Sequence, residues 1–445
     1  MATKRGMMTA ALSLAGPVFA EESYSLLLSA VIVAIVGNLG PHDLAAFSLA
    51  FLLQGSVVSI VGVIGIGAAI LTAREVGAGN WGLLRQIAGQ TLALGVAGGV
   101  VLGCAGHEAL PHLHSFVDTD EKIALLTEML LQPLCLFVPF SLVTWLGKSI
   151  LRGMGETRLA FVIIAVNNTT VLIATCLLIY ACHPGLGVLG AVWGAGAGSV
   201  ASAITTLILL FSHRQLALKI KNLCQLKVAV VSQILRISLP VAWEQLALQF
   251  GFTLYNLELI NVGAKAFAGN QIAQQLEGIP QMIGVGFSAA VLTVVGQSLG
   301  KNRPQVARQF ARFSGAITIV AMPVLCALIA LVASPLTRLF TADPEVASWS
   351  VACILLAILE QPTMAATMIL GHALRGSGDT FWPACSSVIG MWLIRIPLTY
   401  FLITAQDYGI TTAWLITATD YFVRSVILSL RFFQTDWEKR RLFFR

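Results

Sequence analysis

Long apolar runs dominate the chain, and short polar or Gly/Pro-rich turns separate them. A helix needs about 20 mainly apolar residues to cross the hydrocarbon core of a bilayer. We therefore expect an all-α integral membrane protein. The pattern predicts twelve spanning helices, at 11–38, 44–73, 86–106, 123–148, 159–181, 188–211, 235–262, 266–297, 306–333, 346–372, 381–404 and 409–431.

The composition agrees with lipid as the main solvent of this chain. Of its 445 residues, 57% are hydrophobic and 11% are charged, and the mean hydropathy is +0.84. Soluble domains carry about 25% charged residues. We therefore exclude soluble enzymes, nucleic-acid partners and secreted disulfide scaffolds, and expect membrane lipids as partners. The eight cysteines form no CxxC pair and read as small buried hydrophobes.

The basic residues indicate the orientation of the helices. With the N-terminus placed in the cytoplasm, the outer loops hold only Lys122, Lys265 and Arg338, and the other loops hold most of the Lys and Arg. An excess of Lys and Arg marks cytoplasmic loops. We predict a multi-pass protein of the cell membrane, the inner membrane in a Gram-negative source, with both termini in the cytoplasm. The first span follows Lys4 and Arg5 as in a signal peptide, but its apolar run resumes at Leu26, so we expect it to be retained.

The two halves of the chain are related by a duplication. A shift of 223 positions aligns Pro17 with Pro240, Glu21 with Glu244, and the segment LRGMGET at 151–157 with LRGSGDT at 374–380. Each half then holds six helices, and an even number gives parallel repeats related by an axis along the membrane normal. The predicted domains are a six-helix N-terminal lobe at 1–215 and a six-helix C-terminal lobe at 216–445. A basic amphipathic linker at about 212–234 joins them.

Several of these segments resemble the MATE multidrug and toxic-compound extrusion transporters. The doubled LRGxG[ED]T signature is the most specific, and segments 37–80, 295–300 and 390–397 are also similar to the family. The resemblance covers nearly the whole chain. It implies V-shaped lobes and a secondary antiporter that exports organic, often cationic, compounds in exchange for Na⁺ or H⁺ by alternating access. It implies no cofactor beyond the coupling ion, and we expect a monomer.

The chain departs from the family at three positions. Many members carry an acid where this chain has Ile32, Leu248 and Met364. Glu244 lies four residues before Leu248, and Glu360 lies four residues before Met364. Four residues keep a side chain on the same helical face, about 6 Å along the axis. The ion chemistry is therefore either preserved one turn away or lost.

Acids inside a membrane are costly and point to function. We predict that Glu244 and Glu360 carry the coupling cation or proton, since both lie within apolar helices of the second repeat. Glu21, the repeat partner of Glu244, and Glu277, the partner of Gln54, are the next candidates. The alternative for each is a structural hydrogen bond between helices.

Three further residues are candidates for contact with the substrate. Trp243 and Tyr255 either offer aromatic faces to a cation or serve in packing or interfacial anchoring, which we favour for any single one. Arg395 lies deep in a span, where it either pairs with a carboxylate, which we favour, or binds an anionic part of a substrate. We expect no metal site: His107, His112 and His114 cluster in an outer loop, but no zinc-ligand signature fits.

Other functions remain as alternatives. A lipid-linked saccharide flippase of the same superfamily would need several deep Arg and Lys residues to hold pyrophosphate, and only Arg395 is deep. An intramembrane enzyme would need a catalytic pair within the spans, and all seven His lie at or near predicted loops. A channel is a weaker alternative, because two asymmetric lobes do not form a symmetric pore. The absence of a GxxxxGK[ST] motif argues against ATP hydrolysis.

Overall fold

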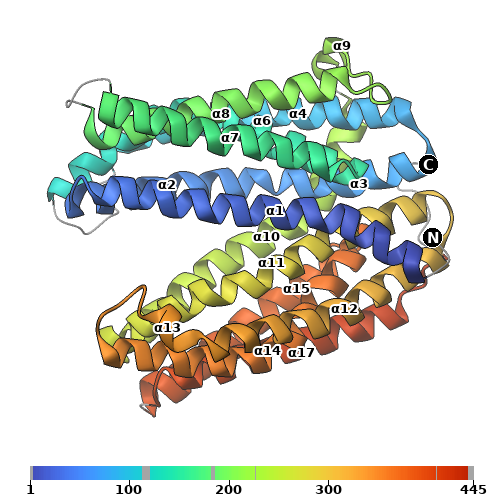
Figure 1. Ribbon diagram of the computed structural model, residues 1–445. Helices are drawn as coiled ribbons and strands as arrows, with labels where there is room; N and C mark the ends of the chain where they lie inside the picture. The colour runs from blue at the N-terminus through green and yellow to red at the C-terminus, as the bar shows by residue number, and fades with distance from the viewer. Residues whose placement is uncertain (1–3, 113–120, 182–185, 226, 407, 439–445) are drawn as a thin grey trace. The chain divides into compact units, whose positions relative to one another are not determined.

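The computed structural model describes residues 4–112, 121–181, 186–225, 227–406 and 408–438. The described part is α-helical and has no β-strand (Figure 1). Eleven of its helical segments are long and apolar enough to cross a membrane. The remaining predicted span corresponds to α10 (Val228–Ile260), which is 33 residues long but is not among these eleven segments.

The helices recur with the predicted offset of 223 residues. The first repeat contains α1 (Lys4–Gly37), α2 (Pro41–Gly62), α3 (Ile64–Ala78), α4 (Trp81–Ala109), α6 (Glu121–Met154), α7 (Thr157–Cys176) and α8 (Gly187–Ser212). The second contains α10, α11 (Ala264–Gly300), α12 (Pro304–Leu331), α14 (Pro344–Gly376), α15 (Phe381–Ile389), α16 (Ile396–Thr399) and α17 (Thr411–Gln434). The predicted two-repeat, all-α architecture is confirmed.

Several short elements complete the chain. A 3₁₀ turn, η1 (Leu110–His112), follows α4, and the short helices α9 (Ile220–Cys224) and α13 (Ala333–Thr337) lie between spans. Three π-helical turns are present: η2 (Leu177–Ala181), η3 (Gly390–Arg395) and η4 (Tyr400–Ala405). With α15 and α16, η3 and η4 form one continuous span at Phe381–Ala405. Single π turns inside α-helices occur often at functional sites.

The chain forms two compact units, and their boundaries lie inside helices. Unit 2 holds residues 20–238, and unit 1 holds residues 1–19 together with 239–445. The first boundary follows Pro17 in α1, and the second precedes Pro240 in α10. The predicted lobes at 1–215 and 216–445 follow the sequence repeat and not these packing boundaries.

Each unit is built around one central helix. In unit 2, α6 packs against α2, α3, α4 and α8, and in unit 1, α14 packs against α11, α12 and α17. These two helices are repeat equivalents. The start of α1 belongs to unit 1, where Met7, Ala11 and Ala15 share a core with residues of α11 and α12.

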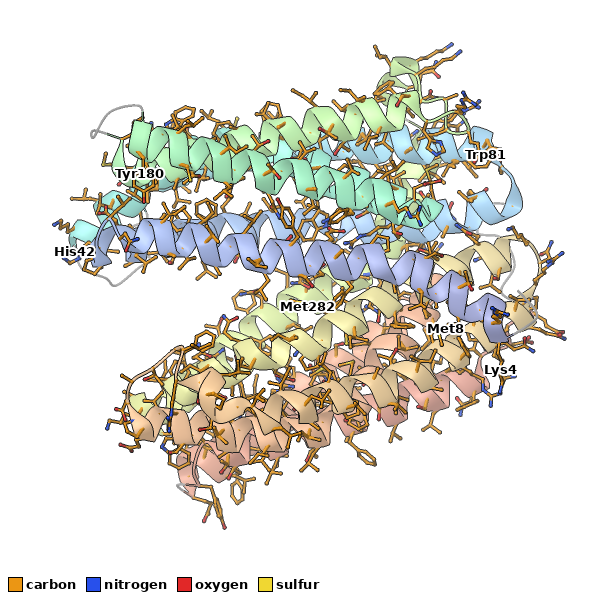
Figure 2. The ribbon with its side chains drawn as sticks, in the orientation of Figure 1. Lys4, Met8, His42, Trp81, Tyr180 and Met282 are labelled. Carbon is orange, nitrogen blue, oxygen red and sulfur yellow. The ribbon has the colours of Figure 1, made fainter. Side chains whose placement is uncertain are left out.

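Large apolar side chains cover the outer surfaces of the helices (Figure 2). Leu27, Leu136, Leu331 and Leu393 are each at least 65% exposed. A water-soluble monomer rarely exposes extended apolar patches. Together with eleven candidate spans, this surface identifies a multi-pass membrane protein whose outer face contacts lipid.

Candidate functional site

The doubled LRGxG segment ends the central helix of each unit in the same way. A Cβ on Gly153 would lie 2.6 Å from the carbonyl oxygen of Ala69, and a Cβ on Gly376 would lie 2.8 Å from that of Leu292. Only glycine therefore fits between the packed helices. The second glycines of the motif, Gly155 and Gly378, adopt φ of 90° and 89°, a left-handed region that favours glycine.

The arginine of each motif holds a buried glutamate. In unit 2, Nη2 of Arg152 lies 2.7 Å from Oε2 of Glu21. In unit 1, Nη2 of Arg375 donates to both oxygens of Glu244, at 2.8 and 2.6 Å. Glu21 is 2% exposed and Glu244 is 6% exposed. The duplication thus has a matched ion pair at the same place in each unit.

The two ion pairs differ in their third member. Lys148 donates to Oε1 of Glu21 at 2.7 Å, so two cations surround that carboxylate. The second repeat has Gly371 at the position equivalent to Lys148, so it lacks this second cation. Its third member is Ser387, whose neutral hydroxyl donates to Oε1 of Glu244 at 2.7 Å. Each oxygen of both carboxylates therefore has at least one partner. The predicted role of Glu21 and Glu244 in coupling stays a prediction.

Unit 1 encloses a cavity of about 270 Å³, here called the C-terminal cavity. Glu277 from α11 and Glu360 from α14 both line it. Glu277 accepts a hydrogen bond from Nε2 of Gln361 at 3.2 Å. Glu360 is 1% exposed, and neither of its carboxyl oxygens has a hydrogen-bond partner in the described structure. Glu277 is also its electrostatic neighbour.

Arg395 reaches the same cavity from the π-helical turn η3. It donates through Nε to Oδ2 of Asp420 at 2.9 Å, which confirms the favoured ion pair. Arg424 also donates to Asp420 through Nε and Nη2. The guanidinium of Arg395 lies 5.5 Å from the ring centroids of Phe252, Tyr255 and Tyr421. Aromatic faces at this distance stabilise a cation.

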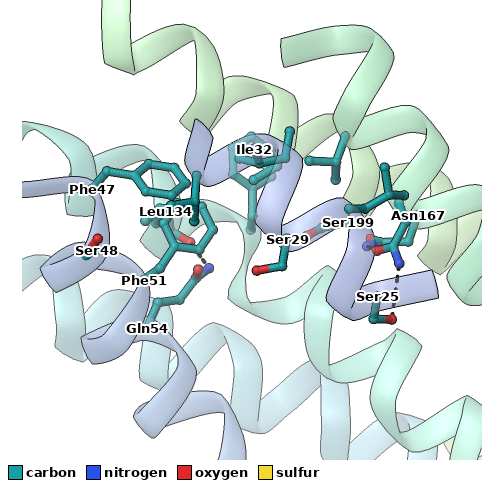
Figure 3. A pocket seen from close by; sticks show the side chains of 17 residues that line it. Ser25, Ser29, Ile32, Phe47, Ser48, Phe51, Gln54, Leu134, Asn167 and Ser199 are labelled. Atoms are coloured by element: carbon teal, nitrogen blue, oxygen red, sulfur yellow. Dashed lines mark hydrogen bonds between the residues drawn. The ribbon is translucent and has the colours of Figure 1, made fainter. Parts of the chain in front are cut away.

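Unit 2 encloses a second cavity of about 380 Å³, here called the N-terminal cavity (Figure 3). Its lining comes from α1, α2, α6, α7 and α8. Gln54 lies toward one side of the labelled set, and Ser25 and Asn167 toward the other. No lining residue is charged.

The sequence candidates fall in different places. Glu277, Glu360, Tyr255 and Arg395 meet at the C-terminal cavity, whereas Glu21 and Glu244 lie in the ion pairs. Trp243 is 67% exposed on α10. Sequence reasoning missed Gln361, Tyr421 and Ser387, because their positions depend on how separate helices pack. The paired arginines were visible in the sequence, since the offset that matches Glu21 with Glu244 also matches Arg152 with Arg375.

The described residues contain no group of three or more His, Cys, Asp or Glu that would hold a metal ion. His114 of the predicted histidine cluster lies outside the described residues.

The chain is similar to known proteins over most of its length. The MatE family model matches residues 17–178 and 240–401. A probable multidrug resistance protein NorM from Thermotoga maritima is 25% identical over 442 residues, which are 98% of this chain and 94% of the relative. A probable multidrug resistance protein YoeA from Bacillus subtilis is 22% identical over 409 residues, 91% and 88% of the two chains.

Solved structures show the same fold. A MOP superfamily transporter from Pyrococcus furiosus matches with a TM-score of 0.88 at 19% identity, over 95% of this chain and 94% of that one. An outward-facing multidrug resistance MATE family transporter also matches with a TM-score of 0.88, at 18% identity and over 95% of each chain. The two-repeat fold of this chain is therefore the fold of these solved structures.

Proposed function

The chain belongs to the MatE family, and we propose that it exports organic, mainly cationic, compounds by alternating access in exchange for Na⁺ or H⁺. Members of this family are transporters and not enzymes. The names of the relatives support multidrug export as the activity. The coupling ion and its site are argued here from the C-terminal cavity.

The observation that carries the proposal is the buried carboxyl group of Glu360, which has the second acid Glu277 beside it. Burying a polar group without a hydrogen bond costs free energy, and burying an isolated charge costs far more. Both oxygens of Glu360 are buried and lack such partners, and Glu277 is its acidic neighbour. A proton or a cation bound between the two acids would remove this cost. We therefore propose Glu360 and Glu277 as the coupling pair.

The charges around this cavity support one coupling ion per cycle. Glu277, Glu360 and Asp420 are the acids of this group, and Arg395 and Arg424 are its bases. With all five ionised, one negative charge remains. Asp420 balances one of the two positive charges, and the other offsets half of the charge of the Glu277–Glu360 pair, which keeps one negative charge. One Na⁺ or one proton neutralises it.

Competition for this carboxylate would couple the two fluxes. An ion bound from outside neutralises the pair and favours one arrangement of the helices around the cavity. An organic cation that approaches from the cytoplasm favours the ionised pair and displaces the ion. A ligand shifts a conformational equilibrium only by its difference in affinity for the two states.

The test is transport in proteoliposomes with an imposed Na⁺ or pH gradient and ethidium as the cationic probe. Glu360→Gln keeps the size of the side chain and removes its charge, so gradient-driven export should fall to the background of empty vesicles. The matched control is Glu128→Gln in α6, the same change at a residue that lines neither cavity, which should leave export unchanged. Wild-type rates for Glu360→Gln under both gradients would overturn the coupling proposal.

A further inference from the structure

The two cavities occupy the same place in the two repeats. The offset of 223 residues maps five lining residues of the N-terminal cavity onto lining residues of the C-terminal cavity. The pairs are Ser29 and Phe252, Ile32 and Tyr255, Phe51 and Gln274, Gln54 and Glu277, and Phe137 and Glu360. The duplication therefore produced two versions of one cavity, and their side chains can be compared position by position.

The comparison shows that charged side chains line the cavity of the second repeat and not that of the first. Gln54 stands where the second repeat has Glu277, and Phe137 stands where it has Glu360. The position equivalent to Arg395 is Leu172. The N-terminal cavity is therefore lined without a charged side chain. A charged ligand placed there would lose its hydration without gaining a counter-charge, which is unfavourable.

The N-terminal cavity offers hydrogen bonds and aromatic faces in place of charge. Asn168 donates to Oγ of Ser25 at 3.1 Å, and Asn167 donates to Oδ1 of Asn168 at 3.0 Å. At the other side Gln54 donates to the carbonyl oxygen of Leu134 at 3.3 Å. Amide groups both donate and accept, so each side retains capacity for a ligand.

Aromatic side chains form part of the wall between these polar groups. The rings of Phe47 and Phe51 lie with their centroids 4.4 Å apart. The ring of Phe137 packs against Gly196, at a position where a Cβ would overlap it. Figure 3 shows Phe47 and Phe51 on the same side as Gln54, with Ser29 between them and Asn167. A flat ring would find apolar contacts in the middle and polar groups at its edges.

We propose that the N-terminal cavity binds uncharged aromatic compounds with hydrogen-bonding groups at opposite edges. Its volume of about 380 Å³ lies within the usual range for small-molecule sites. The transport consequence rests on the proposed function: the exporter would carry uncharged aromatic compounds as well as cations. Binding itself can be tested without transport.

Acridone and N-methylacridinium form a suitable pair of fluorescent probes. They share a three-ring frame, but acridone is uncharged, with N–H and C=O at opposite edges, and N-methylacridinium is a cation. Binding is measured by fluorescence titration of the purified protein in lipid nanodiscs, with empty nanodiscs as the reference. We expect saturable acridone binding to the wild type. Gln54→Leu and Asn168→Leu should each weaken it roughly tenfold, as for the loss of one buried hydrogen bond.

The matched control is Gln274→Leu, the same change in the lining of the C-terminal cavity, which should leave acridone affinity unchanged. Gln54→Glu keeps the side-chain length and should weaken acridone binding while strengthening that of N-methylacridinium. Thermal melting of each variant shows whether it is folded. Absence of saturable acridone binding, or equal losses in Gln274→Leu and Gln54→Leu, would overturn the inference. Gradient-driven ethidium export by the wild type would still stand in that case, and failure of export with intact acridone binding would overturn only the proposed function.

Discussion

Glu21 and Glu244 occupy the same place in the two repeats, but their carboxylates are balanced differently. Glu21 contacts both Lys148 and Arg152, whereas Glu244 forms its ion pair with Arg375. A buried ion pair contributes little net stability when intact, but removal of one partner leaves an uncompensated charge. The second repeat should therefore be the more sensitive of the two to loss of its arginine.

Arg375→Met should destabilise the protein by about 3–5 kcal/mol, because Glu244 keeps only the hydroxyl of Ser387. Arg152→Met is the matched comparison and should cost clearly less, because Lys148 still neutralises Glu21. Thermal melting in detergent measures both. The double variant Glu244→Gln, Arg375→Met should recover much of the loss. Equal melting temperatures for the two arginine variants would contradict the role assigned to Lys148.

At the scale of the helix, the two glycines of each LRGxG segment have different structural roles. Gly153 and Gly376 allow a close approach of the central helix to a neighbouring backbone, and Gly155 and Gly378 end that helix in a left-handed conformation. The backbone N–H of Glu156 then donates to the carbonyl oxygen of Leu151, and that of Asp379 to the carbonyl oxygen of Leu374, each at 2.9 Å. The motif is thus a helix terminator that also presents its arginine to the glutamate.

Gly376→Ala should destabilise unit 1 by about 1–3 kcal/mol, because its Cβ would press on the carbonyl oxygen of Leu292 and the packed helices must move. The control is Gly278→Ala in α11, where a Cβ would meet nothing within 4 Å. Alanine is the better helix former by about 0.5–1 kcal/mol, so that variant should melt at the same temperature or higher. A lower melting temperature for Gly278→Ala than for Gly376→Ala would refute this account.

The sequence predicts the helices well because apolar length is a local property. Within the single span Pro41–Ala78, it does not predict the turn at Val63 that divides α2 from α3, since the equivalent α11 is continuous. The same limit applies to the sites. Arg395 was expected to find a carboxylate, but its three aromatic neighbours come from α10 and α17, and only packing brings them together. The cavities are likewise invisible in the sequence, because each is lined by several helices.

At the scale of the whole molecule, the first segments of α1 and α10 each pack into the unit formed mainly by the other half of the chain. Ala15 lies against Gly286 within unit 1, and its repeat partner Ser238 lies against Gly67 within unit 2. Pro17 and Pro240 stand beside the two unit boundaries, and a proline inside a helix removes one backbone hydrogen bond. The connections between the units therefore run through helices and not through loops alone.

The orientation of the molecule in the membrane can be tested at repeat-equivalent positions. His42 and Lys265 lie at the starts of α2 and α11, are exposed, and are separated by the repeat offset of 223 residues. Parallel repeats place both on the same side of the membrane, and the excess of Lys and Arg in the opposite loops predicts that this side is the outer one. In a cysteine-free background, a maleimide that cannot cross the membrane should label His42→Cys and Lys265→Cys in intact cells. Lys301→Cys, at the other end of α11, should react only after permeabilisation. Labelling of His42→Cys without Lys265→Cys would exclude parallel repeats, and labelling of Lys301→Cys alone in intact cells would reverse the predicted orientation.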